Sequence, residues 1–243
     1  MKQYYKFLFD SSQKYKLISF YLIIRLFVFR KLSFLGKKYY NQYISLNSQK
    51  LDFKKDGRYT QDWFSYNIKY ISRILFKYEL QNKKLNILEL GSYEGLSTVF
   101  FLTMLKHSNI YCVDPFVDFE ENKDKDFNKV YENFKYNTQK FENRIRLSKS
   151  TSDNFFEKGI KEKFDLIYID GNHLYDFVKK DISNSLNFIN KEGIIVLDDY
   201  KLKGWWNDGV TRAIDYFIKT KKIKILEQHN LINYHHQCIL QKI

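Results

Sequence analysis

Residues 87–97 read Ile-Leu-Glu-Leu-Gly-Ser-Tyr-Glu-Gly-Leu-Ser, and the fold prediction starts from this segment. An apolar run ends at Leu90, glycines follow at Gly91 and Gly95, and an apolar segment with helical spacing begins at Leu96. Glycine where a strand turns into a helix lets the backbone approach a ligand closely, and the helix N-terminus presents free N–H groups. The stretch therefore predicts a buried strand, a ligand-binding turn and a helix, unless both glycines are ordinary turn residues.

Strands and helices alternate along the rest of the chain. Apolar runs suited to buried strands lie at 86–90, 110–114, 144–148, 164–170 and 193–198. Segments with helical periodicity separate them, near 96–107, 127–141, 175–190 and 209–219. Two closing runs, at 222–227 and 237–242, have no helix-length segment between them, which indicates an antiparallel pair. We expect an α/β fold with a doubly wound, mostly parallel sheet, an antiparallel C-terminal strand and helices on both faces.

The length and composition fit one domain with an extension. The chain has 243 residues, of which 44% are hydrophobic and 28% charged, and these values exclude a disordered chain and a protein with several membrane spans. We expect the folded domain over residues 58–243, preceded by a helical extension over residues 1–57. Cys112 and Cys238 lie in apolar runs, which indicates buried thiols in a reducing compartment, and hence a cytoplasmic protein.

The extension combines an apolar stretch with basic residues. Leu17–Phe29 is interrupted by Arg25 and is shorter than the roughly 20 apolar residues of a membrane-spanning helix. No small-residue cleavage site of a signal peptide follows it. The basic residues over 14–38 are Lys14, Lys16, Arg25, Arg30, Lys31, Lys37 and Lys38. This pattern fits two alternatives: an amphipathic helix on an anionic membrane, which would make the protein membrane-associated at the surface, or a helix docked on the domain.

The charge balance is strongly basic, with 41 basic against 28 acidic residues and a net charge of +13. Such a surplus is compatible with nucleic acid or with an anionic membrane as a partner. However, the lysines are spread along the chain, and the abundance of Lys, Asn, Ile, Tyr and Phe is the profile that AT-rich coding produces. Nucleic acid is therefore not the partner that we expect.

Acidic residues accompany the glycine turn. The G-x-x-x-G spacing lacks the third glycine of the dinucleotide pattern G-x-G-x-x-G, which argues against an NAD-dependent oxidoreductase. Glu89 beside the turn disfavours a pyrophosphate and favours a cationic ligand. Asp114 ends the second strand, where a carboxylate can accept hydrogen bonds from a ribose diol, and a helix cap is the alternative.

Three carboxylates and a histidine follow the later strands. Asp170 ends the fourth strand and Asp198 and Asp199 end the fifth, so a parallel sheet brings them to one edge. Converging carboxylates repel one another unless they are protonated or hold a cation, and their hard oxygen atoms suit Mg²⁺ or another divalent ion. The alternative is that Asp198 caps the next segment and only Asp170 faces the site. His173 lies beside this cluster, and the usual pKa of histidine, about 6.5, suits a general base.

Taken in order, these motifs resemble the class I S-adenosylmethionine-dependent methyltransferases. The acidic residue, the G-x-x-x-G turn and the ribose acid one strand later carry the first part of the resemblance. Four further segments are similar to the branch with a D-G-x-H motif, which includes sugar and macrolide O-methyltransferases: 60–67 (TQDWFSYN), 164–173 (FDLIYIDGNH), 193–200 (GIIVLDDY) and 209–215 (GVTRAID). The resemblance covers about residues 58–243 and leaves the extension out.

The resemblance implies a Rossmann-like fold, S-adenosylmethionine as methyl donor and, in several members, a divalent metal. The residues expected on the methionine side of the donor are Glu89, Gly91, Ser92, Gly95 and Ser97. Asp114 is expected to bind the ribose hydroxyls, and Ser152, within Ser150–Ser152, is expected to flank the adenine. In the family pattern, Asp170, Asp198 and Asp199 are the metal ligands.

The sequence therefore predicts a methyltransferase, and the expected reaction is metal-assisted O-methylation of a hydroxyl on a small molecule or sugar. His173 is the expected general base, and Asp170 is the second catalytic residue. Trp205 and Trp206 fit either an aromatic wall for the acceptor or the packing of a lid segment. Two alternatives for the function stay open: RNA ribose methylation, and a catalytically silent module that uses the fold for binding. Base amine methylation is disfavoured, because Ile-Asp-Gly-Asn-His stands where (N/D)-P-P-(Y/F) would be.

Overall fold

The computed structural model describes residues 54, 56–65, 67–117, 125–201, 204, 206–231 and 235–243. The chain divides at Ser48, and Gln49–Ile243 forms one compact unit. Our expectations for the basic segment 14–38 and for Trp205 lie outside the described residues, and the predicted boundary at residue 58 stays a prediction. Within the part of the chain that is described, no helix is long and apolar enough to cross a membrane.

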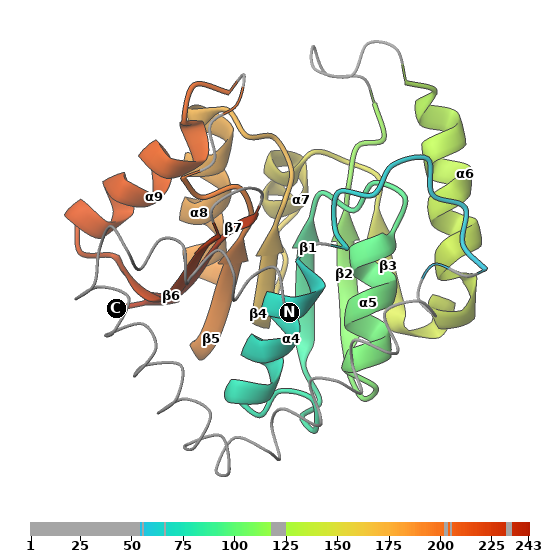
Figure 1. Cartoon of the computed structure of the whole chain (residues 1–243), viewed down its shortest axis with the longest axis horizontal. Coiled ribbons are helices and arrows are strands. Elements are labelled where there is room, and N and C mark those ends of the chain that lie inside the picture. The colour runs from blue at the N-terminus through green and yellow to red at the C-terminus, as the bar shows by residue number, and fades with distance from the viewer. Residues whose placement is uncertain are drawn as a thin grey trace, which may run out of the picture. The chain divides into compact units, whose positions relative to one another are not determined.

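Seven strands form one sheet in the order β3-β2-β1-β4-β5-β7-β6 (Figure 1). Their bounds are β1 Asn86–Leu90, β2 Asn109–Val113, β3 Ile145–Ser148, β4 Phe164–Ile169, β5 Ile189–Leu197, β6 Ile223–Leu231 and β7 His235–Lys242. β1 to β5 pair in parallel, and β7 pairs antiparallel with both β5 and β6. The predicted Rossmann-like fold class, including its antiparallel C-terminal strand, is confirmed.

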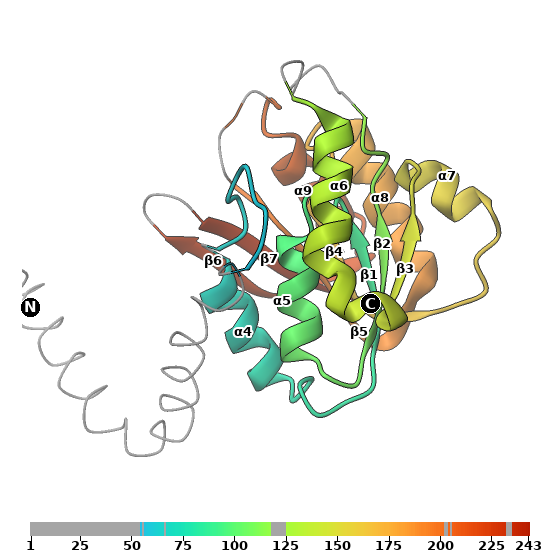
Figure 2. The same cartoon turned by 90° about the vertical axis from the view of Figure 1, so that its right-hand side faces the viewer.

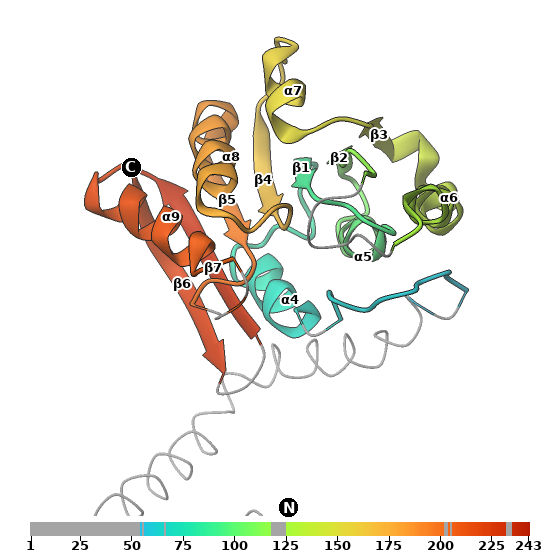
Figure 3. The same ribbon diagram turned by 90° about the horizontal axis from the view of Figure 1, so that it is seen from above.

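Helices cover both faces of this sheet (Figures 2 and 3). On one face lie α4 (Ile68–Lys77), α5 (Leu96–Met104) and α6 (Phe127–Thr138), which the 3₁₀ helix η2 (Gln139–Arg144) follows. On the other face lie α7 (Ser152–Glu157), α8 (Tyr175–Phe188) and α9 (Gly209–Lys219). Because both faces are covered, the central strands are apolar on both sides, and Ile87, Leu88 and Ile167 are fully buried.

The strand order reverses between β1 and β4, and the carboxyl ends of the parallel strands meet at one edge of the sheet. The backbone N–H of Asp170 donates to the carbonyl of Leu90 at 2.9 Å, which joins the ends of β4 and β1. The N–H of Gly91 donates to the carbonyl of Val113 at 2.9 Å, which joins β1 to β2. Ligands of open α/β sheets bind at such a reversal point, so the fold places the glycine turn where a ligand is expected.

Three elements differ from the sequence-based expectation, and the short helix α7 is one of them, since no helix was expected between β3 and β4. The helix α4 was not predicted, because Asn67 at its N-cap makes no side-chain capping bond and uses its amide elsewhere. β5 begins at Ile189, inside a segment that we expected to be helical up to residue 190. A register shift between Phe164 and Leu166 accommodates the early start, and the Asn190 amide donates to Asp165 at 2.7 Å. The features of α4 and β5 depend on contacts between distant parts of the chain, which periodicity does not reveal.

Candidate active site

A cavity of about 760 Å³ lies at the carboxyl edge of the sheet, lined by the glycine turn, the starts of α7 and α8, and the segment 59–67. The expected site residues in its lining are Gly91, Ser92, Ser97, Asp114, Ser152, Asp170, His173, Asp198 and Asp199. Among the expected site residues, all of which the structure describes, Glu89 and Gly95 are not part of the lining. The fold thus brings the predicted site residues other than Glu89 and Gly95 into the lining of one cavity.

Both glycines of the turn have a left-handed backbone, with φ of +89° at Gly91 and +80° at Gly95. A Cβ on Gly91 would lie 2.0 Å from the carbonyl oxygen of Asp170, so a side chain cannot be accommodated there. A Cβ on Gly95 would lie 2.8 Å from Cγ2 of Thr138. Glycine was expected here for the close approach of a ligand, and the structure shows that Gly91 also permits the close approach of the end of β4.

Asp114 shapes the glycine turn from the end of β2. Its Oδ2 accepts hydrogen bonds from the backbone N–H groups of Ser92 at 3.0 Å and Tyr93 at 2.9 Å, and its Oδ1 accepts one from Phe116 at 2.7 Å. Burial raises the pKa of this carboxyl, and the three N–H donors act in the opposite direction. Because each carboxylate oxygen has two lone pairs, Asp114 keeps capacity to accept further hydrogen bonds from a ligand.

Glu89 is fully buried beneath the turn. The hydroxyl of Thr98 donates to its Oε2, and the thiol of Cys112 lies 3.4 Å from the same oxygen. Burial raises the pKa of Glu89, and hydrogen bonds from the neighbouring hydroxyls partly offset this rise. The carboxyl supports the turn from below, and its role on the methionine side of the donor stays a prediction.

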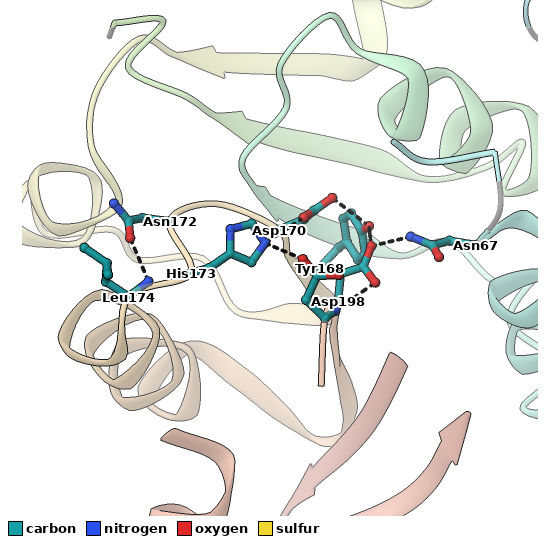
Figure 4. Close-up of polar contacts among 8 residues, drawn as sticks. Asn67, Tyr168, Asp170, Asn172, His173, Leu174 and Asp198 are labelled. Atoms are coloured by element: carbon teal, nitrogen blue, oxygen red, sulfur yellow. Dashed lines mark hydrogen bonds and ion pairs between the residues drawn. The ribbon is translucent and has the colours of Figure 1, made fainter. Parts of the chain in front are cut away.

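Asp170, Asp198 and Asp199 gather where β4 and β5 end, and Figure 4 shows Asp170 and Asp198 with His173 on one side and Asn67 on the other. The Tyr168 hydroxyl lies 3.0 Å from Oδ2 of Asp170 and 3.3 Å from Oδ2 of Asp198. The Asn67 amide also donates to Asp198. Burial raises the pKa of Asp198 well above its usual range, and the charges of Asp170 and Asp199 add to this rise. The repulsion expected between these acids is therefore present.

The His173 imidazole interacts with two of the three acids. Its Nε2 lies 3.0 Å from Oδ2 of Asp199 and 3.7 Å from Oδ1 of Asp170. Figure 4 shows the imidazole beside Asp170. Burial lowers the pKa of His173, but the hydrogen bonds and charges of Asp170 and Asp199 outweigh burial and raise it to about 10. The ring stacks at a tilt on Trp206, with 5.0 Å between the ring centroids. In this arrangement His173 carries a positive charge at neutral pH.

The described part of the chain contains no group of three or more His, Cys, Asp or Glu side chains arranged to hold a metal ion. Two contacts of the acid cluster explain why the described residues form no such group. The imidazole of His173 lies against Asp170 and Asp199, and Asp198 is engaged by Asn67 and Tyr168. Three carboxylates nevertheless meet and repel one another here, and carboxylate oxygens are the ligands that hard cations take in proteins.

A strap over residues 58–63 contributes Tyr59 and Gln61–Trp63 to the wall of the cavity. Its anchor is Glu94, which we expected either to contact the donor or to face solvent. The Glu94 carboxylate accepts hydrogen bonds from the N–H of Thr60 at 2.6 Å and from the Asn133 amide at 2.8 Å. Trp63 from the strap packs on Tyr93 of the glycine turn, with 4.9 Å between the centroids. The glycine turn and the strap are therefore connected.

Asn67, Tyr168 and Glu94 are the site residues whose roles the sequence reasoning missed. All three lie inside segments quoted for the family resemblance or inside the glycine turn. The signal that could have found Asn67 is a polar side chain at the start of a helix, and for Tyr168 it is a hydroxyl within a buried strand. Its partner in the fold could not be read from sequence spacing.

Comparisons with known proteins agree with this geometry. Residues 88–200 match a family model described as a methyltransferase domain. An uncharacterised protein of Acanthamoeba polyphaga mimivirus, R132, is 27% identical over 128 residues, which make up 50% of this chain and 54% of that protein. The chain thus matches about half the length of this curated relative.

Three solved structures share the fold. A candidate O-methyltransferase from Klebsiella pneumoniae is 15% identical with a TM-score of 0.56, over 82% of this chain and 89% of that chain. A candidate rRNA methylase from Clostridium thermocellum is 15% identical with a TM-score of 0.55, over 76% of this chain and 98% of that chain. The O-methyltransferase TomG from Streptomyces achromogenes, solved with S-adenosylmethionine, is 13% identical with a TM-score of 0.51. The match covers 70% of this chain and 76% of that chain.

Residues 88–200 therefore match a methyltransferase domain, and the fold is the one that class I S-adenosylmethionine-dependent methyltransferases have. The solved structures include methylases of different acceptors, so the likeness establishes the fold and not the acceptor.

Proposed function

We propose that this protein transfers the methyl group of S-adenosylmethionine to a hydroxyl oxygen of a small molecule or sugar. The observation that carries the proposal is the position of the His173 imidazole, which lies beside Asp170 and Asp199 in the same cavity as the glycine turn. Methyl transfer to an alcohol needs a donor site and a proton acceptor that face one acceptor oxygen. A cavity with both supports this reaction.

The donor would lie across the carboxyl ends of β1 and β2. Its methionine part would lie against the glycine turn, its ribose on Asp114, and its adenine beside Ser152. Support comes from the cavity lining, which includes Asp114 and Ser152 together with Ser92 and Ser97. The cavity of about 760 Å³ also includes the acid cluster, where an acceptor would lie beside the donor.

In the reaction, the acceptor oxygen attacks the methyl carbon in line with the sulfonium sulfur. The C–O bond forms as the C–S bond breaks, and the electron pair stays on sulfur to give S-adenosylhomocysteine. The hydroxyl proton goes to Nε2 of His173, the general base. This step uses the neutral form of His173, whose population increases as the pH approaches the pKa of about 10.

We extend the proposal to a divalent cation held by Asp170, Asp198 and Asp199. The support is the hard oxygen chemistry of this donor set and the repulsion that raises the pKa of Asp198. When bound, such a cation would supply Lewis-acid stabilisation of the negative charge that develops on the acceptor oxygen. The three aspartates would hold it, and Tyr168 and Asn67 would orient Asp198.

The acceptor end of the cavity supports a ring-shaped neutral acceptor over RNA. At the acid cluster, Trp206 stacks on His173. Beside the glycine turn, Trp63 packs on Tyr93, and the Lys125 ammonium lies 3.7 Å from the Trp63 ring centroid. Aromatic faces suit sugars and flat rings. The acids of the cluster disfavour the phosphates of RNA, so RNA ribose methylation is the competing outcome of the acceptor test.

The proposal is tested in two stages on the full chain. Calorimetry with S-adenosylmethionine, with and without Mg²⁺, should give donor binding, and Mg²⁺ alone should bind wild type more tightly than Asp199→Asn. Donor labelled in its methyl group is then offered to sugars, to small hydroxyl compounds and to RNA. Labelling of RNA ribose without labelling of the small hydroxyl compounds would overturn the acceptor class, and unchanged turnover in a chelator would remove the cation.

Asp114→Ala should weaken the binding of S-adenosylmethionine by about 1–3 kcal/mol, because the ribose hydroxyls lose their hydrogen bonds to a charged group. The glycine turn also loses the hydrogen bonds that the N–H groups of Ser92 and Tyr93 donate to this carboxylate. Asp126→Ala is the matched control, since Asp126 also accepts backbone N–H bonds, at the N-cap of α6, outside the cavity. Calorimetry should show a loss for Asp114→Ala only. Equal affinities in wild type and Asp114→Ala would remove the ribose assignment.

A further inference from the structure

Asp181 on α8 is a buried acid that the proposed reaction does not use. Its side chain lines the cavity, and only 4% of the residue is exposed. Its Oδ1 has no hydrogen-bond partner among the described residues. The neighbouring Lys180 pairs with Asp153, at 3.0 Å. A buried carboxylate oxygen without a partner is costly, so a donor group from a ligand is a natural explanation.

The position of Asp181 indicates which part of a ligand it would meet. α7 packs against α8 on the same face of the sheet (Figure 3), and Ser152 at the start of α7 is a hydrogen-bond neighbour of Asp181. Phe177 lies one helical turn before Asp181, also lines the cavity and is 43% exposed. Residues four apart share a helix face, so α8 presents an aromatic ring at the mouth of the cavity and a carboxylate further in.

We propose that Asp181 selects the adenine of the methyl donor by accepting a hydrogen bond from its exocyclic N6 amine. The proposal rests on the proposed function, because it requires S-adenosylmethionine in this cavity with its adenine beside Ser152. A carboxylate only accepts hydrogen bonds, and the N6 amine only donates them, so the two groups match. Phe177 would cover the face of the same base.

The electrostatic setting of Asp181 agrees with this role. Burial raises the pKa of this carboxyl to about 7, with a further rise from Asp153, while Ser152 and Lys180 act in the opposite direction. An N–H donor from a ligand would favour the ionised form. The competing explanation is structural: Asp181 holds the first turn of α7 through Ser152 and does not contact the base.

A pair of ligands that differ at the 6-position of the base, with a hydrogen added on N1 in the inosyl form, separates the two explanations. S-adenosylhomocysteine carries the N6 amine, and S-inosylhomocysteine carries a carbonyl oxygen there, which an ionised carboxylate would repel. The affinities of both are measured by calorimetry for the full-length wild type, Asp181→Asn, Asp181→Ala and Asp176→Asn. Asp176 is an exposed acid on α8 that does not line the cavity, which makes it a matched control.

Wild type and Asp176→Asn should prefer the adenosyl ligand by at least about tenfold, the scale of a hydrogen bond to a charged group. In Asp181→Asn the amide can donate to the inosyl oxygen, so the preference should fall by about tenfold or reverse, and in Asp181→Ala it should approach one. The ratio is internal to each variant, so a general loss of fold or affinity cannot mimic this result.

A ratio that stays at the wild-type value in both Asp181 variants would overturn the proposal and favour the structural role. Equal binding of the two ligands by wild type would overturn it as well. In both cases the adenosyl ligand still binds, so the proposed function stands. Failure of wild type to bind either ligand would count against the donor itself, and therefore against both proposals.

Discussion

Gly91→Ala is expected to abolish the binding of S-adenosylmethionine and to lower the free energy of unfolding by on the order of 3–5 kcal/mol, at the upper end of single substitutions. Two effects combine. The left-handed backbone at φ +89° costs a residue with a Cβ about 1–2 kcal/mol. The added Cβ would also lie 2.0 Å from the Asp170 carbonyl oxygen, so the end of β4 must move away from the turn. Chemical denaturation and calorimetry measure the two losses.

Gly159→Ala is the matched control for this prediction. Gly159 also has a left-handed backbone, with φ +75°, but a Cβ there would meet no atom within 4 Å. We expect Gly159→Ala to cost only the backbone strain of about 1–2 kcal/mol and to leave donor affinity unchanged. The difference between the two variants then isolates the contact between the glycine turn and β4. Equal losses in both variants would contradict the role that we give to this contact.

The sheet and its acidic edge were predictable from sequence, because buried parallel strands are short apolar runs and their carboxyl ends share an edge. Asp170, Asp198 and Asp199 therefore meet as their positions after two such runs indicated. Less predictable was what surrounds them. Asn67 lies at the N-cap of α4, but its amide donates to Asp198 instead of capping the helix. These two residues are 131 positions apart in the sequence, so tertiary packing brings them together, and the spacing of residues within a motif does not predict their contact.

The properties of individual site groups were less predictable than their positions. His173 was expected to titrate near the usual histidine value of about 6.5, whereas its contacts with Asp170 and Asp199 raise its pKa to about 10. The hydrophobic periodicity of α8 does not distinguish Asp181 from the other polar residues of this helix. Only the fold shows that Asp181 is buried in the cavity lining. Charge and burial at a site follow from distances of a few ångströms, which a motif does not fix.

His173→Ala should lower turnover by about 10²–10⁴-fold, the usual contribution of a general base, while donor affinity stays within about twofold of wild type. Turnover is followed with methyl-labelled donor and the acceptor that the screen identifies, and donor affinity by calorimetry. A fall in donor affinity as large as the fall in turnover would instead indicate that His173 shapes the donor site.

The pH dependence of turnover should identify His173 as the group that accepts the proton. Because its neutral form is the base and its pKa is about 10, turnover of wild type should rise with pH up to that region. Asp199→Asn removes the acid 3.0 Å from Nε2, so it should lower the midpoint of the rise towards the usual histidine value. Added Mg²⁺ should lower the midpoint of wild type in the same direction, because a cation beside Asp170 and Asp199 offsets the charges that hold the proton on His173. If His173→Ala keeps the rise at the same midpoint, another group accepts the proton and the base assignment is wrong.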